Sequence, residues 1–159
     1  MVSRLGDYAI SKTPSLYHHK KINPTVDNHQ QKISHLKALY HLAAADGVLS
    51  KVEGIYIKNV AERLGVNLEE LINFDPKNEP TLELPDREYK IYALFHRLAI
   101  IIMIDNTVDE RERHYCFTLG IKMGLHPNAV GEIIDHIMAK GSMNVTPAEV
   151  MNIFRKYLS

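Results

Sequence analysis

The chain has 159 residues, of which 45% are hydrophobic and 24% are charged, as in an ordinary soluble globular domain. Its 19 basic and 19 acidic residues give a formal net charge of zero, which argues against a nucleic-acid or anionic-membrane partner. The single cysteine, Cys116, excludes an internal disulfide framework and favours a reducing compartment. No stretch resembles a secretory signal or a membrane span, so we expect a cytoplasmic protein without membrane insertion.

The first 28 residues contain prolines, a glycine and a short basic cluster without sustained periodicity, and we expect residues 1–28 to form an extended arm. From Gln30 onward, apolar residues recur at spacings of three and four, which predicts an amphipathic helix. This helix is expected to end near Asp46, because Gly47 can adopt the left-handed conformation that closes a helix. Its predicted buried face comprises Ile33, Leu36, Leu39, Tyr40 and Ala43.

A second helix is predicted from Ser50 to Gly65, since Ser50 and Glu53 have the spacing of a capping box. A short third helix is predicted after Asn67, which can cap it. Residues 74–86 contain three prolines among acidic residues and are expected to form a linker. The predicted buried residues are Val52, Ile55, Tyr56, Val60 and Leu64 in the second helix, and Leu68, Leu71 and Ile72 in the third.

After the linker, a helix from about Tyr89 to Ile104 is apolar over more than half of its circumference, and we expect it to be the most buried element. Asp109 and Glu112 then repeat the capping-box spacing at the start of the next helix. Two further helices are predicted to open at Pro127 and at Thr146. The predicted buried residues of these four helices are Ile91, Leu94, Phe95, Leu98, Ile101, Ile102, Cys116, Leu119, Met123, Val130, Ile133, Ile134, Ile137, Val150, Ile153, Phe154 and Tyr157.

Few segments have the alternating pattern of a strand, so the sequence predicts an all-α protein with a helical bundle of about seven helices. We expect a single helical domain over residues 29–159, built from two pseudo-symmetric repeats. The first repeat covers about residues 30–73 and the second about residues 87–140, with the linker between them. The C-terminal helix is expected over residues 146–158.

The two predicted repeats share an acidic spacing at a fixed offset of 59 residues (46 to 105). The match is one of register: an apolar run, an acidic turn, a capped helix and a small residue that ends the helix. Self-similarity of this kind indicates a duplicated supersecondary unit. The positions that keep the offset without a gap are Asp46 and Asp105, Glu53 and Glu112, Tyr56 and Tyr115, and Gly65 and Gly124.

The acids at the two junctions are open to two interpretations. Helix capping alone can explain the acids at the start of each following helix. It does not explain Asp46 and Asp105, because the helix macrodipole disfavours a carboxylate at a C-terminal end. These two residues either hydrogen bond to the next helix or belong to a site for a divalent cation, which prefers carboxylate and carbonyl oxygens.

Familiar catalytic motifs are missing from the sequence. It contains no His-Glu-x-x-His zinc motif, no phosphate-binding loop and no Gly-x-Ser-x-Gly nucleophile elbow. Glu110 with His114 and Glu132 with His136 have four-residue spacing, and we interpret them as surface pairs. Cys116 lacks an activating pattern and is interpreted as a core residue. We therefore expect no enzymatic activity, no catalytic residue and no cofactor-binding residue.

The first junction resembles that of the TerB-like family, which includes tellurite-resistance protein TerB and the related N-terminal domain of the membrane-anchored co-chaperone DjlA. The resemblance is carried by the run from Ala43 to Ser50, by Glu53, and by the run from Ala61 to Val66. These runs are similar to the family's Ala-Asp-Gly-x-hydrophobic-Ser/Asp-x-x-Glu junction and its Leu-Gly-hydrophobic ending. The second junction, from Asp105 to Glu112 with Met123-Gly124-Leu125, resembles the paired family motif.

The resemblance runs from about residue 30 to residue 140 and implies an all-helical, non-enzymatic domain with a pseudo-twofold arrangement. It also implies that the acids of the two junctions meet at a divalent-cation site, in a protein connected with tellurite and other chemical stress. The cation could be calcium, magnesium, manganese or zinc, which the residue types do not distinguish. The metal-ligand candidates, carried over by position, are Asp46, Glu53, Asp105, Asp109 and Glu112.

The preferred functional hypothesis is a non-catalytic TerB-like module that binds a divalent cation, a protein partner or both in a stress response. The alternative is a purely structural scaffold or interaction domain whose acids only cap helices. A more remote alternative is a metal-dependent enzyme that uses the junction carboxylates. We expect a protein partner and no nucleic acid, and a homo-oligomer stays open.

Overall fold

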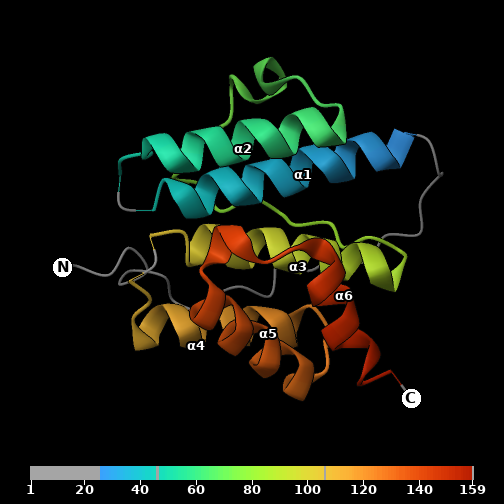
Figure 1. Ribbon diagram of the computed structural model, residues 1–159. Coiled ribbons are helices and arrows are strands. Elements are labelled where there is room, and N and C mark those ends of the chain that lie inside the picture. Colours follow the sequence, from blue (N-terminus) through green and yellow to red (C-terminus); the bar gives the residue numbers. More distant parts are fainter. Residues whose placement is uncertain (1–25, 46, 106, 159) are drawn as a thin grey trace. The chain divides into compact units, whose positions relative to one another are not determined.

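The computed structural model describes residues 26–45, 47–105 and 107–158. Within these residues the chain forms helices and no strand element, as Figure 1 shows, so the all-α prediction is confirmed. The described helices fall in two compact units, which we call the first unit (residues 26–85) and the second unit (residues 86–158). The first unit contains α1 (Val26–Ala43), α2 (Lys51–Leu64) and the 3₁₀ helix η3 (Leu68–Leu71), and the second contains α3 (Glu88–Ile102), α4 (Glu110–Lys122), α5 (Pro127–Lys140), the 3₁₀ helix η4 (Ser142–Asn144) and α6 (Pro147–Arg155).

The first unit begins with α1, which lies beside α2 (Figure 1). Helix α1 also contacts η3. Because α1 starts at Val26, the last three residues of the predicted arm belong to this helix, while residues 1–25 lie outside the described part of the chain. Leu39 and Ala43 are buried on the predicted face of α1. The turn that follows contains Gly47, whose φ of 86° is the left-handed conformation expected there.

Helix α2 begins and ends as predicted, but its buried face differs from the prediction. Ser50 and Glu53 form the capping box, and Gly65 closes the helix with a φ of 68°. Val52 and Ile55, predicted to be buried, are 53% and 51% exposed. The true face includes Glu53, whose carboxylate tolerates burial because it accepts a hydrogen bond from the Ser50 N–H at 2.8 Å. A hydrophobicity pattern misses such a face, which comprises Glu53, Tyr56, Ile57, Val60 and Ala61.

The predicted third helix is a single 3₁₀ turn, η3, which Asn67 caps. Leu68 and Ile72, predicted to face inward, are 38% and 81% exposed, whereas Leu71 is half-buried. Four residues make little more than one turn of 3₁₀ helix, so η3 has no continuous buried face. The third element of the first unit therefore exposes apolar side chains instead of burying them.

The segment after η3, predicted to be a linker, is held against α1 by hydrogen bonds. His41 Nδ1 donates to the carbonyl of Pro76 at 2.6 Å, and His35 Nε2 donates to the carbonyl of Glu83 at 2.9 Å. The Glu83 N–H in turn donates to Ser34 Oγ at 3.3 Å. Two leucines of this segment are also buried. The segment is thus an integral part of the first unit.

The second unit is built around α3, which packs against α4, α6 and η4. Most of α3 is buried, in agreement with its predicted central role. Tyr92 of α3 stacks on Phe154 of α6 with ring centroids 3.9 Å apart. The predicted helix starts are also confirmed: Asp109 and Thr146 each form a capping box, and Pro127 is the first residue of α5.

The two units have similar local environments at equivalent positions, and then diverge. Glu53 and Glu112 are 1% and 3% exposed, and the caps Asn67 and His126 keep the 59-residue offset (67 to 126). However, Asn67 starts a helix of 4 residues, whereas His126 starts one of 14 residues. A proline cannot donate to the helical ladder, so Pro76 limits any extension of η3. The pseudo-twofold relation between the two units stays a prediction.

Candidate functional site

At the first acidic junction, the described carboxylate caps a helix. Glu53 Oε2 accepts from the Ser50 N–H at 2.8 Å, and Ser50 Oγ accepts from the Glu53 N–H at 3.2 Å. Because Glu53 is only 1% exposed, the surrounding side chains fix this arrangement. Asp46 lies outside the described residues, and its role as a metal ligand stays a prediction.

At the second junction, all three candidate ligands have local partners. Asp105 Oδ1 accepts from the Thr107 N–H at 3.2 Å, which gives this exposed acid a turn-forming role. Asp109 Oδ1 accepts from the Glu112 N–H at 2.8 Å, and Glu112 Oε2 accepts from the Asp109 N–H at 3.2 Å. Asp109 Oδ2 also lies 3.8 Å from Arg111 Nη2. These contacts account for the three acids without a cation.

No group of three or more His, Cys, Asp or Glu side chains is placed to hold a metal ion within residues 26–45, 47–105 and 107–158. The two junctions belong to different units. A site that uses Glu53, Asp105, Asp109 and Glu112 together with Asp46 therefore stays a prediction.

The first unit contains a largely apolar groove of about 490 Å³ along α2. Its lining includes Gly54, in the first turn of α2, where an added Cβ would meet only Leu49 Cδ2, at 3.7 Å. Ile72, which is 81% exposed, also lines the groove. The groove therefore offers apolar contacts and a point of close approach to the α2 backbone. Its other principal lining residues are Tyr40, Ile57, Leu68, Leu71 and Phe74.

The difference between η3 and α5 explains the groove. In the second unit, Arg113 Nη2 of α4 donates to Asp135 Oδ1 of α5 at 2.8 Å, so α5 extends past this part of α4. The residue of α2 at the same offset (54 to 113) is Gly54, which lines the groove. The counterpart of α5 is η3, which ends at Leu71. The face of α2 that corresponds to the covered face of α4 is therefore open at Gly54.

The groove has rims of opposite charge. Residues 67–79, which form the η3 side, carry four acids and one lysine, and Glu69 lines the groove itself. On α2, Lys51 and Lys58 lie one turn before and one turn after Gly54, and both are exposed. A ligand of this groove should therefore combine apolar side chains with charges that match both rims.

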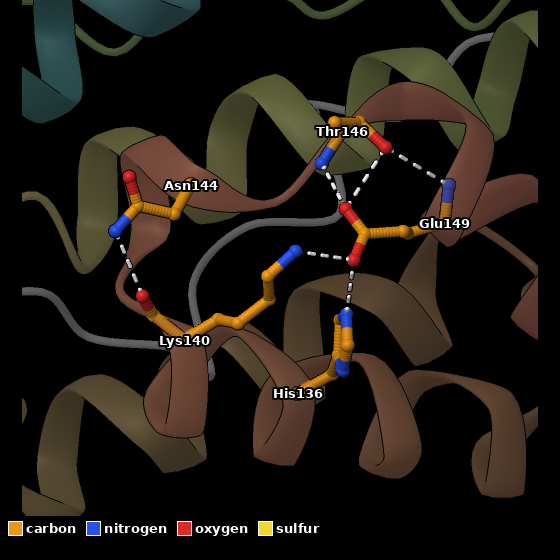
Figure 2. Close-up of polar contacts among 5 residues, drawn as sticks. All are labelled: His136, Lys140, Asn144, Thr146 and Glu149. Carbon is orange, nitrogen blue, oxygen red and sulfur yellow. Dashed lines mark hydrogen bonds and ion pairs between the residues drawn. The ribbon is translucent and has the colours of Figure 1, made fainter.

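A separate polar cluster joins α5 to α6 in the second unit, as Figure 2 shows. Glu149, in the first turn of α6, accepts from Lys140 Nζ at 2.5 Å and from His136 Nε2 at 3.1 Å. It also accepts from the N–H of Thr146 at 2.7 Å and from its hydroxyl at 2.9 Å. These donors, Lys140 first, hold the pKa of the Glu149 carboxyl far below its ordinary value. Each contact ties α6 to its own cap or to α5, so we interpret the cluster as structural.

The other ionisable candidates also have structural roles. His136 pairs with Glu149, whereas the carboxylate of Glu132, its predicted partner, accepts from Lys156 and from the hydroxyl of Tyr157. Cys116 is fully buried, as predicted, and burial raises the pKa of its thiol. Among the described residues, no helix has the length and apolar character needed to cross a membrane.

Comparison with known families gives a match over the first part of the chain. Residues 2–75 match the family model described as tellurite resistance protein TerB. No curated protein and no solved structure matches the chain. The match includes the first junction and nearly the whole groove and ends before Asp105, so the resemblance of the second junction rests on its residues alone. The match confirms, over residues 2–75, the resemblance to the TerB-like family that the first junction indicates.

Proposed function

We propose that the chain is a non-catalytic, TerB-like interaction module, and that the groove of its first unit binds an amphipathic helix of a protein. One observation carries this proposal: the face of α2 that is open at Gly54 corresponds to the face of α4 that α5 covers. Because α4 accepts a helix on this face, the equivalent open face of α2 is suited to accept a helix of a partner protein.

The packing of α5 on α4 indicates what such a ligand needs. At Gly120 of α4, an added Cβ would lie only 2.7 Å from Val130 Cγ2 of α5, so this glycine allows the two helices to approach closely. Gly54 provides a comparable point of approach in the groove, with Ile57 and Leu71 beside it. An incoming helix can therefore bury apolar side chains there, each contributing about 1.5–3 kcal/mol when fully buried.

The helix propensity of Gly54 supports a binding role. A glycine inside a helix costs about 1 kcal/mol relative to alanine, and the site has room for a methyl group. Stability of α2 alone therefore does not account for glycine at this position. An open backbone that contacts a ligand does account for it.

The family resemblance also implies cation binding and a role in chemical stress, and the support for each of these differs. Cation binding has less support than protein binding, because the described junction acids already accept hydrogen bonds within their own turns. A role in tellurite resistance or another chemical stress is proposed from the family match alone. A cytoplasmic location, expected from the sequence, belongs to the same proposal.

A displayed library of helical peptides, selected on the immobilised full chain, tests the groove directly. We expect the wild type to retain peptides with apolar residues at spacings of three and four. The Gly54→Leu variant should lose most of them, because its side chain fills the groove while keeping good helix propensity.

Gly54→Ala is the matched control. Its methyl group makes an ordinary contact at 3.7 Å, so this variant should bind the selected peptides and gain about 1 kcal/mol of stability. Circular dichroism checks that all variants are folded. A library that yields no helical binder, or binders that ignore Gly54→Leu, contradicts the proposal.

A further inference from the structure

A second cavity, of about 380 Å³, lies in the second unit where α5 ends, and we call it the α5 pocket. Its wall contains the five consecutive residues from Ile137 to Gly141, so the pocket lies around the end of the helix instead of following one side of it. Its volume falls in the range of about 300–1,000 Å³ that is usual for small-molecule sites. The other lining residues are Met103, Val108, Ser142 and Asn144.

The last turn of α5 presents two backbone carbonyls without a hydrogen-bond partner. An α-helix leaves its last four carbonyls without partners inside the helix. In α5 the Ile137 carbonyl accepts from a backbone N–H at 2.8 Å. The Lys140 carbonyl accepts from Asn144 Nδ2 at 2.9 Å (Figure 2). Nothing in the described part of the chain donates to the carbonyls of Met138 and Ala139, and both residues line the pocket.

Ser142 adds a further group without a partner. This residue is 1% exposed, and within the described residues its hydroxyl makes no hydrogen bond. A buried hydroxyl without a partner destabilises the folded state, so its presence needs an explanation. Because Ser142 belongs to the wall of the pocket, a ligand there can supply the missing partner.

The electrostatics of the α5 pocket favour a cationic hydrogen-bond donor. The C-terminal end of a helix carries about half a negative charge, and a carbonyl accepts hydrogen bonds but cannot donate them. Of the described residues in the wall, only Lys140 is charged. It does not neutralise the helix end, because its Nζ donates to Glu149 of α6 at 2.5 Å (Figure 2).

We propose that the α5 pocket binds a primary alkylammonium group. The three N–H donors of such a group match the carbonyls of Met138 and Ala139 and the hydroxyl of Ser142. Its alkyl chain lies against the apolar side chains of Met103 and Val108. The group can belong to a free amine or to a lysine side chain of another protein. This inference is independent of the groove, which belongs to the first unit.

NMR of the backbone amides of the isotope-labelled full chain, titrated with n-butylammonium, tests the proposal. We expect the amide signals of residues 138–144 to shift at millimolar ligand. Butyltrimethylammonium is the control, because it has the same charge and alkyl chain but no N–H to donate. It should shift these signals little. Equal responses to the two ions, or no response to n-butylammonium, overturn the proposal.

The Ser142→Ala variant separates a ligand contact from a structural role. Removal of a buried hydroxyl that has no partner should leave the melting temperature unchanged or raise it. The same change should weaken binding of n-butylammonium by about tenfold, because a hydrogen bond to a charged group is lost. A lower melting temperature with unchanged affinity would show a structural hydroxyl, and it contradicts the proposal.

A second probe, Nα-acetyl-lysine methylamide, distinguishes the two sources of the ammonium group. Tighter binding of this probe than of n-butylammonium identifies a lysine side chain of a protein, whose backbone adds contacts. Binding no tighter than that of n-butylammonium identifies a free amine.

Charged side chains at Val108, a half-buried residue of the wall, test the sign of the ligand's charge. Val108→Glu should strengthen the binding of n-butylammonium and Val108→Lys should weaken it, each by about two- to fivefold. Ile121→Glu and Ile121→Lys are the matched controls, because Ile121 is exposed on α4 and does not line the pocket. Circular dichroism checks that all four variants are folded. If folded Val108→Glu and Val108→Lys change the affinity in the same direction, the pocket does not select a cation and the proposal fails.

Discussion

His96 combines deep burial with an ionisable side chain. It lies in α3, is 4% exposed, and hydrogen bonds to the backbone of Val145. Burial, and secondarily the charge of Arg97, lowers the pKa of His96 from 6.5 to about 4. Between about pH 6.5 and pH 4, the folded protein therefore keeps His96 neutral, whereas the unfolded chain protonates it.

The pKa of His96 predicts an acid-sensitive component of stability. Because the folded pKa is lowered, the contribution is present above about pH 6.5 and is lost as the pH falls towards 4. It amounts to about 3 kcal/mol at most, of which about 2 kcal/mol is lost by about pH 5. His96→Gln removes this component. Urea unfolding near neutral pH and near pH 5 should therefore show a weaker pH dependence for the variant, and equal dependences would contradict the prediction.

Gly47 offers a test of backbone strain without steric contacts. Its φ of 86° suits glycine, and an added Cβ would meet no atom within 4 Å. Only the backbone conformation should then penalise a substitution. Gly47→Val should cost about 1–2 kcal/mol more than Gly47→Asn, because asparagine visits the left-handed region far more readily than a β-branched residue. Chemical denaturation of both variants measures the difference, and equal stabilities would refute the assigned conformation.

The contact between α5 and α6 depends on Glu149, which serves two purposes at once. It completes the capping box of α6 with Thr146, and it accepts from Lys140 and His136 of α5. The lowered pKa of Glu149 means that this stabilisation is present above the ordinary carboxyl range and is lost as the pH falls below it. A variant that loses only the cap, or only the contacts to α5, should therefore lose only part of the stability that Glu149 contributes.

Variants at the α6 cap separate these two purposes. Glu149→Gln keeps acceptor oxygen for the cap but loses the ionic contacts, whereas Glu149→Ala loses both. We expect the melting temperature to fall in the order wild type, Glu149→Gln, Glu149→Ala. Thr146→Ala removes the N-cap acceptor and should cost about 1 kcal/mol. Hydrogen exchange of the α6 amides reports the loss locally, and unchanged α6 protection in Glu149→Ala would show that the cluster does not hold α6.

The helix starts were predictable from sequence because they depend on local chemistry. A capping box needs two residues three positions apart, so the sequence alone reveals the pairs Ser50 with Glu53 and Asp109 with Glu112. The buried face of α2 was not predictable in this way, because it includes the carboxylate of Glu53 and excludes two β-branched apolar residues. Burial depends on which other element covers a helix, and η3 covers less of α2 than a full helix would.

The groove could not be predicted from sequence for the same reason. Its existence follows from the difference in length between η3 and α5, which becomes apparent only when the two units are compared. One signal was available: Gly54 stands inside a predicted helix, where glycine is disfavoured unless the backbone is approached closely. The junction acids, by contrast, are conspicuous in the sequence, yet the described ones prove to have local partners.

The two units raise one question that concerns the whole chain, namely whether their acidic junctions meet. Duplicated helix pairs that pack about a pseudo-twofold bring equivalent turns together. Carboxylates that cluster in this way repel one another unless a cation, a basic side chain or protonation compensates. The hydrogen bond from Thr107 to Asp105 leaves room for this role, because it uses only Oδ1 of that carboxylate.

A double variant with Asp46→Asn and Asp105→Asn tests for a shared cation site. Asparagine keeps the size and the acceptor oxygen, so the fold and the turn at Asp105 should persist. If the junctions share a cation, millimolar calcium, magnesium, manganese or zinc should raise the melting temperature of the wild type and not that of the variant. A cation at tenfold its dissociation constant stabilises the folded state by about 1.4 kcal/mol. Glu62→Gln, which removes an exposed acid of α2 outside the junctions, should keep the wild-type response. If no cation shifts the wild type, the junction acids only cap helices and close turns, and the module works through its groove alone.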